Sequence, residues 1–320
     1  MKNLIKLICI VAIVAIVSCK KKDTTPVSTP TPTPTVTDNY SSIADFFSKN
    51  NIAMQTYSIS ATTGGSFTTP QGTVVTIPPN AFLTQSFTGV SGNVTIQFKD
   101  LYKKSDMFLS NMPPMLSYGA PLKSGGEFFI KVIQNNAALI LNTGASITVA
   151  QPAALTGGLD TLNIQQPFIV QQDTFGTGWA AWQADSVFYT TSDYIFGLYN
   201  FNSPIDSGSW CNSDNSSYFS AYPQTTLTLH PNDSLSVYQT TSFLMFSNLS
   251  SMVHVYDNGT NFPYYYAPQG LQCTLVAIGV KGGKLYSSFV PITISANQTV
   301  NFSLSETTTD AFKTALKALN

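Results

Sequence analysis

Between residues 64 and 152 the chain consists of short runs in which apolar and polar residues alternate, separated by glycine and asparagine. Residues 94–98 and 128–132 show this most clearly, with valine, isoleucine or phenylalanine at every second position. A period of two is typical of a β-strand buried on one face. Asn135-Asn136 then predicts a tight hairpin, because asparagine tolerates a positive φ angle. We therefore expect an antiparallel β-sandwich in this region.

The same texture continues through residues 153–304, where short strand candidates follow one another without helical runs between them. Asn258-Gly259 and Gly282-Gly283 are turn signals, and the second pair is the strongest two-residue hairpin signal in the chain. Strands at such regular spacing indicate further sandwich structure. The predicted fold class is all-β, with two antiparallel β-sandwich regions.

Two short helices are expected outside the strands, near residues 42–48 and 307–319. In the first, Ser42 can cap the helix with Asp45 three residues later, and the apolar face should pack on the first sandwich. In the second, Thr307 is the expected cap of a helix that docks on the last sheet.

Residues 1–18 have the anatomy of an export signal, with a basic start and an apolar run at 7–17 that is too short to span a bilayer. Ile16-Val17-Ser18-Cys19 resembles the lipobox of bacterial lipoproteins. The resemblance implies cleavage before Cys19, attachment of diacylglycerol and palmitate, and a lipid anchor in the outer membrane. The alternative is an ordinary signal peptide with a cysteine at this position by chance.

A Thr-Pro repeat at residues 29–35 predicts an extended, semi-rigid spacer between the anchor and the folded region. Surface-exported lipoproteins are often acidic just after the lipidated cysteine, whereas residues 20–22 are lysines. The face of the membrane, periplasmic or surface, therefore stays open. The predicted organisation is a signal peptide at 1–18, lipidated cysteine and linker at 19–40, first sandwich with its helix at 41–152, and second sandwich region with its helix at 153–320.

Two segments carry a resemblance to a known family. They are Thr-Ile-Pro-Pro-Asn-Ala-Phe at residues 76–82 and Leu-Lys-Ser-Gly-Gly-Glu-Phe at residues 122–128. Together with the glycine-punctuated strands, they make residues 60–152 resemble a ZU5-type β-sandwich module. The resemblance implies a protein-interaction or scaffolding role and brings no catalytic residues. In the polar stretch around Lys103, Lys104 and Asp106 we expect a solvated face.

The charges argue against nucleic-acid binding. All fifteen cations are lysines, and the net charge is −1. Arginine is the residue that recognises phosphate and guanine in a planar, bidentate way, and the chain has none. A net charge near zero also gives no long-range attraction toward a polyanion.

Four cysteines divide into two pairs. Cys9 would be removed with the signal, and Cys19 would carry lipid. Cys211 and Cys273 could form a disulfide in an oxidising compartment, closing a loop of about sixty residues and contributing ~3–4 kcal/mol. The alternative is two separate buried thiols.

Nothing in the sequence predicts a cofactor, a resident metal or a catalytic site. The chain has none of the common nucleophile-elbow, zinc-protease or nucleotide-loop motifs. Asp206, Asn212 and Asp214 could offer oxygen ligands to calcium, but they do not follow the calcium-loop pattern, and we expect an Asx-rich turn. His254 lies near Asp257, which leaves a hydrolase as a remote alternative, although we expect both histidines to be outward strand residues.

Aromatic residues support a different alternative, a sugar-stacking platform. The candidate ligand aromatics are Trp179, Trp182, Trp210, Tyr264 and Tyr266. Tyr264 and Tyr266 are expected to share one face of a proline-flanked loop, where exposed aromatics suit ligand contact. Packing inside a sandwich is the competing interpretation.

The sequence therefore favours a non-enzymatic envelope lipoprotein with a protein-interaction or scaffolding role. A glycan-binding surface lipoprotein is the alternative, and a hydrolase is the third hypothesis. The expected partners are a membrane, through the N-terminal lipid, and an envelope protein or a glycan.

Overall fold

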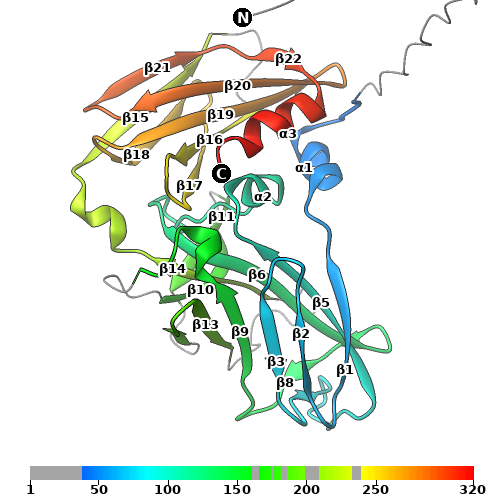
Figure 1. Ribbon diagram of the computed structural model, residues 1–320. Coiled ribbons are helices and arrows are strands. Elements are labelled where there is room, and N and C mark those ends of the chain that lie inside the picture. The colour runs from blue at the N-terminus through cyan, green and yellow to red at the C-terminus, as the bar shows by residue number, and fades with distance from the viewer. Residues whose placement is uncertain (1–37, 161–165, 174–175, 182–185, 199–208, 233–238) are drawn as a thin grey trace, which may run out of the picture. The chain divides into compact units, whose positions relative to one another are not determined.

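The computed structural model describes residues 38–160, 166–173, 176–181, 186–198, 209–232 and 239–320 (Figure 1). The predicted signal, Cys19 and the Thr-Pro repeat lie outside these residues, as does Trp182. Residues 37–320 cluster into one compact unit that is mostly strand, which confirms the predicted all-β class. No helix in the described part of the chain has the length and apolarity to cross a bilayer.

Two sheets form the first sandwich (Figure 1). The larger sheet has the strand order β1 (Gln55–Ser60), β5 (Asn93–Leu101), β6 (Lys123–Gln134), β14 (Ser209–Asn215), β10 (Gln166–Asp173) and β11 (Gly176–Ala181), with β7 (Ala137–Ala138) also pairing with β6. The smaller sheet has the order β12 (Ser186–Tyr189), β13 (Asp193–Leu198), β9 (Ile147–Pro152), β3 (Val74–Ile77) and β2 (Gly65–Thr68). Strands β4 (Phe82–Leu83) and β8 (Ile140–Leu141) pair with each other as a separate two-stranded sheet.

The predicted alternation holds in this sandwich. Its hydrophobic core, here called the first core, is built around Val75, Ile96, Phe98, Phe128 and Phe196. Phe98 and Phe128 belong to neighbouring strands, and their rings stack with centroids 5.7 Å apart. The predicted Asn135-Asn136 hairpin is confirmed, since both residues have positive φ angles and the flanking residues pair as β6 and β7.

The first sandwich extends well beyond residue 152. Strand β13 pairs with β9, and β14 pairs with β6, so strands from the region 186–215 complete both sheets. The boundary expected at 152/153 is therefore wrong, because the first core needs apolar residues such as Phe196 and Leu198 from the later strands. Sequence periodicity identifies strands but does not assign them to a sheet.

A second pair of sheets follows. One has the order β18 (Phe262–Pro268), β15 (Gln224–Pro231) and β21 (Gln298–Phe302); the other has the order β17 (Met252–Val255), β16 (Thr240–Phe246), β19 (Gln272–Lys281), β20 (Lys284–Thr293) and β22 (Ser305–Thr307). All pairings are antiparallel except that of β15 with β21. The predicted Gly282-Gly283 hairpin joins β19 to β20 and is confirmed.

The five-stranded sheet of this pair is buried on both faces. One face forms the second core, built around Leu227, Leu244, Phe246, Leu275 and Phe302. The other face forms the helix core, built around Phe46, Phe108, Phe243, Val276 and Phe312. Because side chains alternate along a strand, successive residues of β16 enter different cores.

Among the described residues, three α-helices and two short 3₁₀ turns accompany the sheets: α1 (Ile43–Asn50), α2 (Lys104–Leu109), α3 (Thr309–Lys317), η1 (Ala153–Thr156) and η2 (Tyr218–Ala221). Ser42 caps α1 as predicted, accepting a hydrogen bond from the backbone N–H of Asp45 at 3.1 Å. Thr308 rather than Thr307 caps α3, because Thr307 still belongs to strand β22.

Two expectations about the helices are wrong. Phe46 of α1 belongs to the helix core with α3 and the five-stranded sheet, so α1 does not pack against the first core. Helix α2 replaces the solvated face expected around residues 103–106, and Lys104 is only 5% exposed. Six residues are too few to show a helical period, so only its burial reveals this helix.

Candidate functional site

The two described tryptophans, Trp179 and Trp210, do not form a sugar platform. Trp179 is fully buried in the helix core, and its Nε1–H donates to the backbone oxygen of Pro113 at 3.0 Å. Trp210 is half-buried and packs edge-on against Phe129, with the Lys99 ammonium 5.7 Å from its ring centroid. Trp179 is therefore structural, because its core position buries the ring and its N–H has a partner. Trp210 packs against the helix core through the faces and edges of its ring.

The tyrosines of residues 264–266 lie in strand β18 and not in the expected loop. Tyr264 is 4% exposed in the second core, whereas Tyr265 is 64% and Tyr266 is 37% exposed. A β-bulge causes this, since the register shifts between Thr225 and Leu227 on the partner strand. A bulge puts two residues opposite one and breaks the period of two. The prediction that Tyr264 and Tyr266 share an exposed face is therefore wrong.

The exposed tyrosines belong to a patch that sequence reasoning missed. Tyr118 is 60% exposed, and its ring meets that of Tyr266 edge to face with centroids 5.5 Å apart. We call Tyr118, Tyr265 and Tyr266 the tyrosine patch. Well over a hundred residues separate Tyr118 from the other two in the chain, and no local sequence pattern predicts the contact between Tyr118 and Tyr266. The patch is the aromatic surface that could receive a ligand.

The two cysteines of the folded region do not form the predicted disulfide. Cys211 lies in the first core and Cys273 in the second core, both buried. Burial raises the pKa of the Cys273 thiol to about 12. The alternative of two separate buried thiols is the one that the structure shows. The number of residues between two cysteines sets how much a disulfide would stabilise the fold. It does not show whether the strands bring the two sulfur atoms within bonding distance.

The histidine and aspartate of the hydrolase hypothesis have different partners. The His254 ring stacks on Phe243 with centroids 4.6 Å apart, and its Nε2 lies 2.7 Å from the Thr241 hydroxyl. Burial lowers the pKa of His254 to about 4. Asp257 instead accepts a hydrogen bond from the backbone N–H of Gly259 at 3.0 Å, closing a turn. His254 is therefore a packed residue and not the outward strand residue that was expected.

The segment expected to be an Asx-rich turn is strand β14, which lies in the middle of the larger sheet of the first sandwich. Asn212, Ser213, Asp214 and Asn215 are all fully buried. Asp206, the other proposed calcium ligand, lies outside the described residues. Within the described ranges no three His, Cys, Asp or Glu side chains group as metal ligands would.

Strand β14 brings two carboxyl groups together in the interior. Glu127 on β6 lies opposite Asn212, whose Nδ2 donates to Asp214 at 2.6 Å and to Glu127 at 3.4 Å. Neither Glu127 nor Asp214 is exposed, and one oxygen of each has no hydrogen-bond partner among the described residues. Burial raises the pKa of both carboxyls well above the ordinary range, and the charge of Asp214 raises that of Glu127 further. We call Glu127 and Asp214 the carboxyl pair.

The glycines of the Ser-Gly-Gly segment make room for this polar interior. Gly126 has a φ angle of +122°, and a Cβ there would lie 2.5 Å from the Tyr102 ring and 2.8 Å from Nε2 of Gln151. Gln151 donates to the Gly126 carbonyl at 2.8 Å and accepts from the Ser213 hydroxyl at 2.7 Å. Only glycine permits this approach of β9 to β6 without strain.

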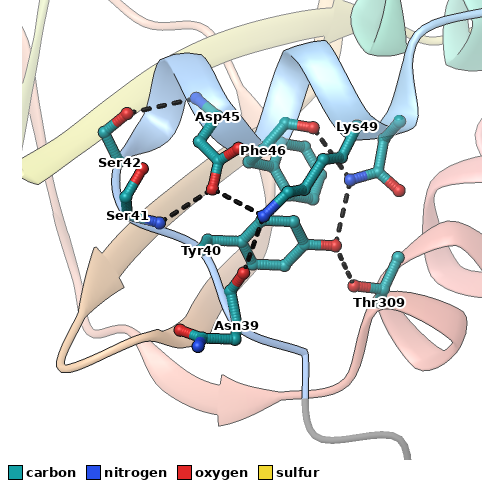
Figure 2. Close-up of polar contacts among 9 residues, drawn as sticks. Asn39, Tyr40, Ser41, Ser42, Asp45, Phe46, Lys49 and Thr309 are labelled. Atoms are coloured by element: carbon teal, nitrogen blue, oxygen red, sulfur yellow. Dashed lines mark hydrogen bonds and ion pairs between the residues drawn. The ribbon is translucent and has the colours of Figure 1, made fainter.

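A third polar arrangement holds the first described residues of the chain against the fold (Figure 2). Tyr40 is 5% exposed, and its hydroxyl lies 2.6 Å from Oγ1 of Thr309, the first residue of α3. Asn50 donates to the same hydroxyl at 3.0 Å and to the Phe46 carbonyl at 2.8 Å. The Tyr40 backbone N–H donates to the Gly283 carbonyl at 3.0 Å, and the Thr309 N–H donates to the Asp38 carboxylate.

Charged groups of α1 complete the same arrangement. Asp45 accepts from the Ser41 N–H at 2.8 Å and from the Lys49 ammonium at 2.9 Å (Figure 2). Lys49 also donates to the Asn39 carbonyl at 3.0 Å and lies 5.5 Å from the Tyr40 ring centroid. We call residues 38–50 with Thr309 and Gly283 the entry latch. It ties the first described residues to α3 and to the β19–β20 hairpin.

Comparison with protein-family models finds no match, and comparison with curated proteins finds none either. Among solved structures, the chain is similar to BcpA, the major pilin subunit of Bacillus cereus. The identity is 10%, the match covers 79% of this chain and 99% of the pilin, and the TM-score is 0.20. A TM-score this low carries no argument about the fold or the function of this chain.

Proposed function

We propose that the chain is a non-enzymatic lipoprotein of the cell envelope, anchored by lipid on Cys19, whose folded region contacts other envelope components. The entry latch is the observation that carries the proposal. A tether pulls on the first residues of the fold, and here those residues are held by buried hydrogen bonds to α3 and to a β-hairpin. The latch begins three residues after the Thr-Pro repeat, as an anchor-and-spacer arrangement requires.

The titratable groups of the described region support the non-enzymatic part of the proposal. His254 packs against aromatic rings, and Glu127 and Asp214 are enclosed between strands. Groups that perform acid–base chemistry must reach a substrate proton within hydrogen-bond distance. The scaffolding role rests on the ZU5 resemblance of residues 60–152.

The anchor is tested by metabolic labelling with an alkyne fatty acid in a host that processes lipoproteins. We expect the wild-type chain and the Cys9→Ala variant to take up label, because Cys9 lies within the signal. The Cys19→Ala variant should take up none and should leave the membrane fraction. Equal labelling of wild type and Cys19→Ala would overturn the lipid anchor.

The interaction role needs a separate experiment. Chemical crosslinking of intact cells that produce the full chain should give a discrete adduct with one other envelope protein. The Cys19→Ala variant should lose this adduct although its ectodomain is unchanged. A labelled, membrane-bound wild-type chain that forms no adduct would leave the anchor standing and remove the scaffolding role.

The tyrosine patch favours a second candidate function, glycan binding. Exposed tyrosine rings offer flat faces on which sugar rings can stack. Each tyrosine ring contributes a large contact area to a binding surface. Replacing all three patch tyrosines by alanine should abolish retention of the full chain on a polysaccharide that retains the wild type. Tyr189→Ala removes an equally exposed ring elsewhere and should have no effect. If no envelope polysaccharide retains the wild type, this candidate fails.

A further inference from the structure

A cavity of about 220 Å³ opens where loops of three strands meet the C-terminal residue. Its walls come from Tyr102–Lys104 at the start of α2, from Leu155–Gly157 at η1, from the β16–β17 turn at Asn248–Ser250, and from Asn320. At roughly 30 Å³ for each water molecule, the volume corresponds to about seven waters, which is the size of a small organic molecule. The tyrosine patch and the carboxyl pair contribute no residue to it.

Lys104 gives this cavity its chemistry. The residue is 5% exposed, and its ammonium donates one hydrogen bond, to the Phe246 carbonyl at 2.6 Å. No ion pair joins Lys104 to an acidic side chain anywhere in the described ranges. An ammonium has three donors, so two remain for another partner. A buried charge without a counter-ion is costly, and an anion in the cavity would remove that cost.

The side chains around the cavity favour an anion. Lys103 also lines it, and no acidic side chain is among the described residues that line it; the anionic group that Asn320 brings to the wall is its C-terminal carboxylate. Asp106 on α2 faces Lys103 and Lys317, and burial raises the pKa of its carboxyl. Asp100 on β5 is already engaged by the hydroxyls of Thr69 and Thr73, each at 2.6 Å.

The rest of the wall narrows the class of anion. Phosphate sites in proteins often add arginine forks or free N–H groups at a helix N-terminus to a lysine, because phosphate offers several oxygen acceptors. The chain has no arginine, and the Ser105 N–H at the start of α2 is already taken by Oδ1 of Asn320 at 2.9 Å. The wall instead offers the amide of Asn248 beside the side chain of Leu249. It also offers the hydroxyl oxygens of Thr156 and Ser250 as acceptors, because their protons are donated to the Ala153 and Tyr102 carbonyls. Such a wall suits a molecule that carries hydroxyl groups next to one carboxylate.

We infer that this cavity binds a small hydroxylated carboxylic acid, whose carboxylate pairs with the ammonium of Lys104. The site depends neither on the lipid anchor nor on the proposed protein contact, so it can fail or stand independently of them. A purely structural role for Lys104, tying α2 to the β16–β17 turn through Phe246, predicts no ligand at all. The two roles therefore differ in an observable way.

Calorimetric titration of the full chain in detergent provides the test, with glucuronate as the probe and glucose as its neutral match. We expect glucuronate to bind at about pH 7 and glucose not to bind. Burial lowers the pKa of Lys104 to about 8, so the charged fraction falls from about nine-tenths at pH 7 to about 3% at pH 9.5. The affinity for glucuronate should therefore fall about 30-fold over this interval.

Substitution tests the residue assignment. Lys104→Met keeps the length of the side chain and removes the charge, and we expect it to weaken glucuronate binding at least tenfold. Lys281→Met removes an exposed lysine of the β19–β20 hairpin and should bind as the wild type does. If Lys104→Met fails to fold, the pH dependence of the wild type still decides the matter. No binding of glucuronate in the millimolar range, equal binding of glucose, or an affinity that is constant between pH 7 and 9.5 would each overturn the inference.

Discussion

The carboxyl pair makes the stability of the fold depend on pH in an unusual direction. Glu127 and Asp214 are fully buried, share one amide donor from Asn212, and have no cation partner in the described part of the chain. Their folded-state pKa values are raised above the ordinary values of 4.5 and 3.8. We therefore expect the folded protein to retain carboxyl protons at pH values where the unfolded chain has already released them.

The sign and size of the effect follow from proton linkage. Below the unfolded pKa values both states are protonated, and the contribution of the pair to stability is complete. As the pH rises, the unfolded chain releases protons that the folded protein retains, so the free energy of unfolding falls. Each retained proton costs about 1.4 kcal/mol per pH unit. This slope applies between the unfolded-state pKa and the raised folded-state pKa of each carboxyl, and the direction is a loss of stability as the pH rises.

Glu127→Gln removes one titrating group at nearly constant volume, and the further change Asp214→Asn removes the second. Urea unfolding of the wild type, the single variant and the double variant between pH 5 and 7 should show a slope that flattens by one proton at each step. Glu306→Gln removes an exposed carboxylate paired with Lys284 and should leave the slope as it is. Parallel stability curves for the wild type and Glu127→Gln would refute the claim that Glu127 is protonated in the fold.

Further predictions concern the latch, the polar interior and the buried thiol. Tyr40→Phe leaves the Thr309 hydroxyl without its partner and should lower the free energy of unfolding by about 1–3 kcal/mol; Tyr265→Phe, at an exposed ring, should change nothing in the same denaturation assay. Gly126→Ala forces a Cβ onto the Tyr102 ring and should cost about 3 kcal/mol or more, whereas Gly144→Ala, with φ +83° and open space, should cost only about 1–2 kcal/mol. Cys273 should resist a disulfide reagent in the folded protein and react in denaturant, as judged by peptide mass, because burial holds its pKa at about 12.

Local features of the sequence predicted local features of the structure well. The hairpins at Asn135-Asn136 and Gly282-Gly283 and the Ser42 cap are each decided by a few neighbouring residues, and all three are present. Period-two alternation placed β3, β5 and β6, because a half-buried strand leaves a visible imprint on the chain. Each of these signals depends only on residues within one element, so it predicts that element without information about which elements pack against it.

The sequence did not predict features that depend on contacts with other elements of the fold. The sequence of strand β14, Trp-Cys-Asn-Ser-Asp, resembles a polar turn because its strand pairing is not visible in the sequence. In the fold, Asn212 and Ser213 hydrogen-bond to side chains of β6 and β9 and not to water. Because of the bulge in β18, Tyr264 is buried and Tyr266 is exposed, and no residue pattern within the strand predicts this bulge. Lys104 is buried by turns from 50 and 140 residues further along the chain. Pairing between strands, and not propensity, decides all three.

The same buried groups determine how the whole fold should respond to acid. Burial of His254 works against the carboxyl pair, because the unfolded chain protonates this histidine below its ordinary pKa of 6.5 while the folded protein does not until about 4. Between about pH 4 and 6.5 His254 contributes a slope of about +1.4 kcal/mol per pH unit, which offsets one retained carboxyl proton. Above pH 6.5 the histidine is neutral in both states, so this offset ends and the slope should fall by about 1.4 kcal/mol per pH unit. Above its pKa of about 8, Lys104 has lost its proton in the folded protein while the unfolded chain retains it, so it contributes a positive slope there. Because only 10% of the residues are charged, few surface groups are present to mask the break near pH 6.5, and its position identifies His254 as the opposing group.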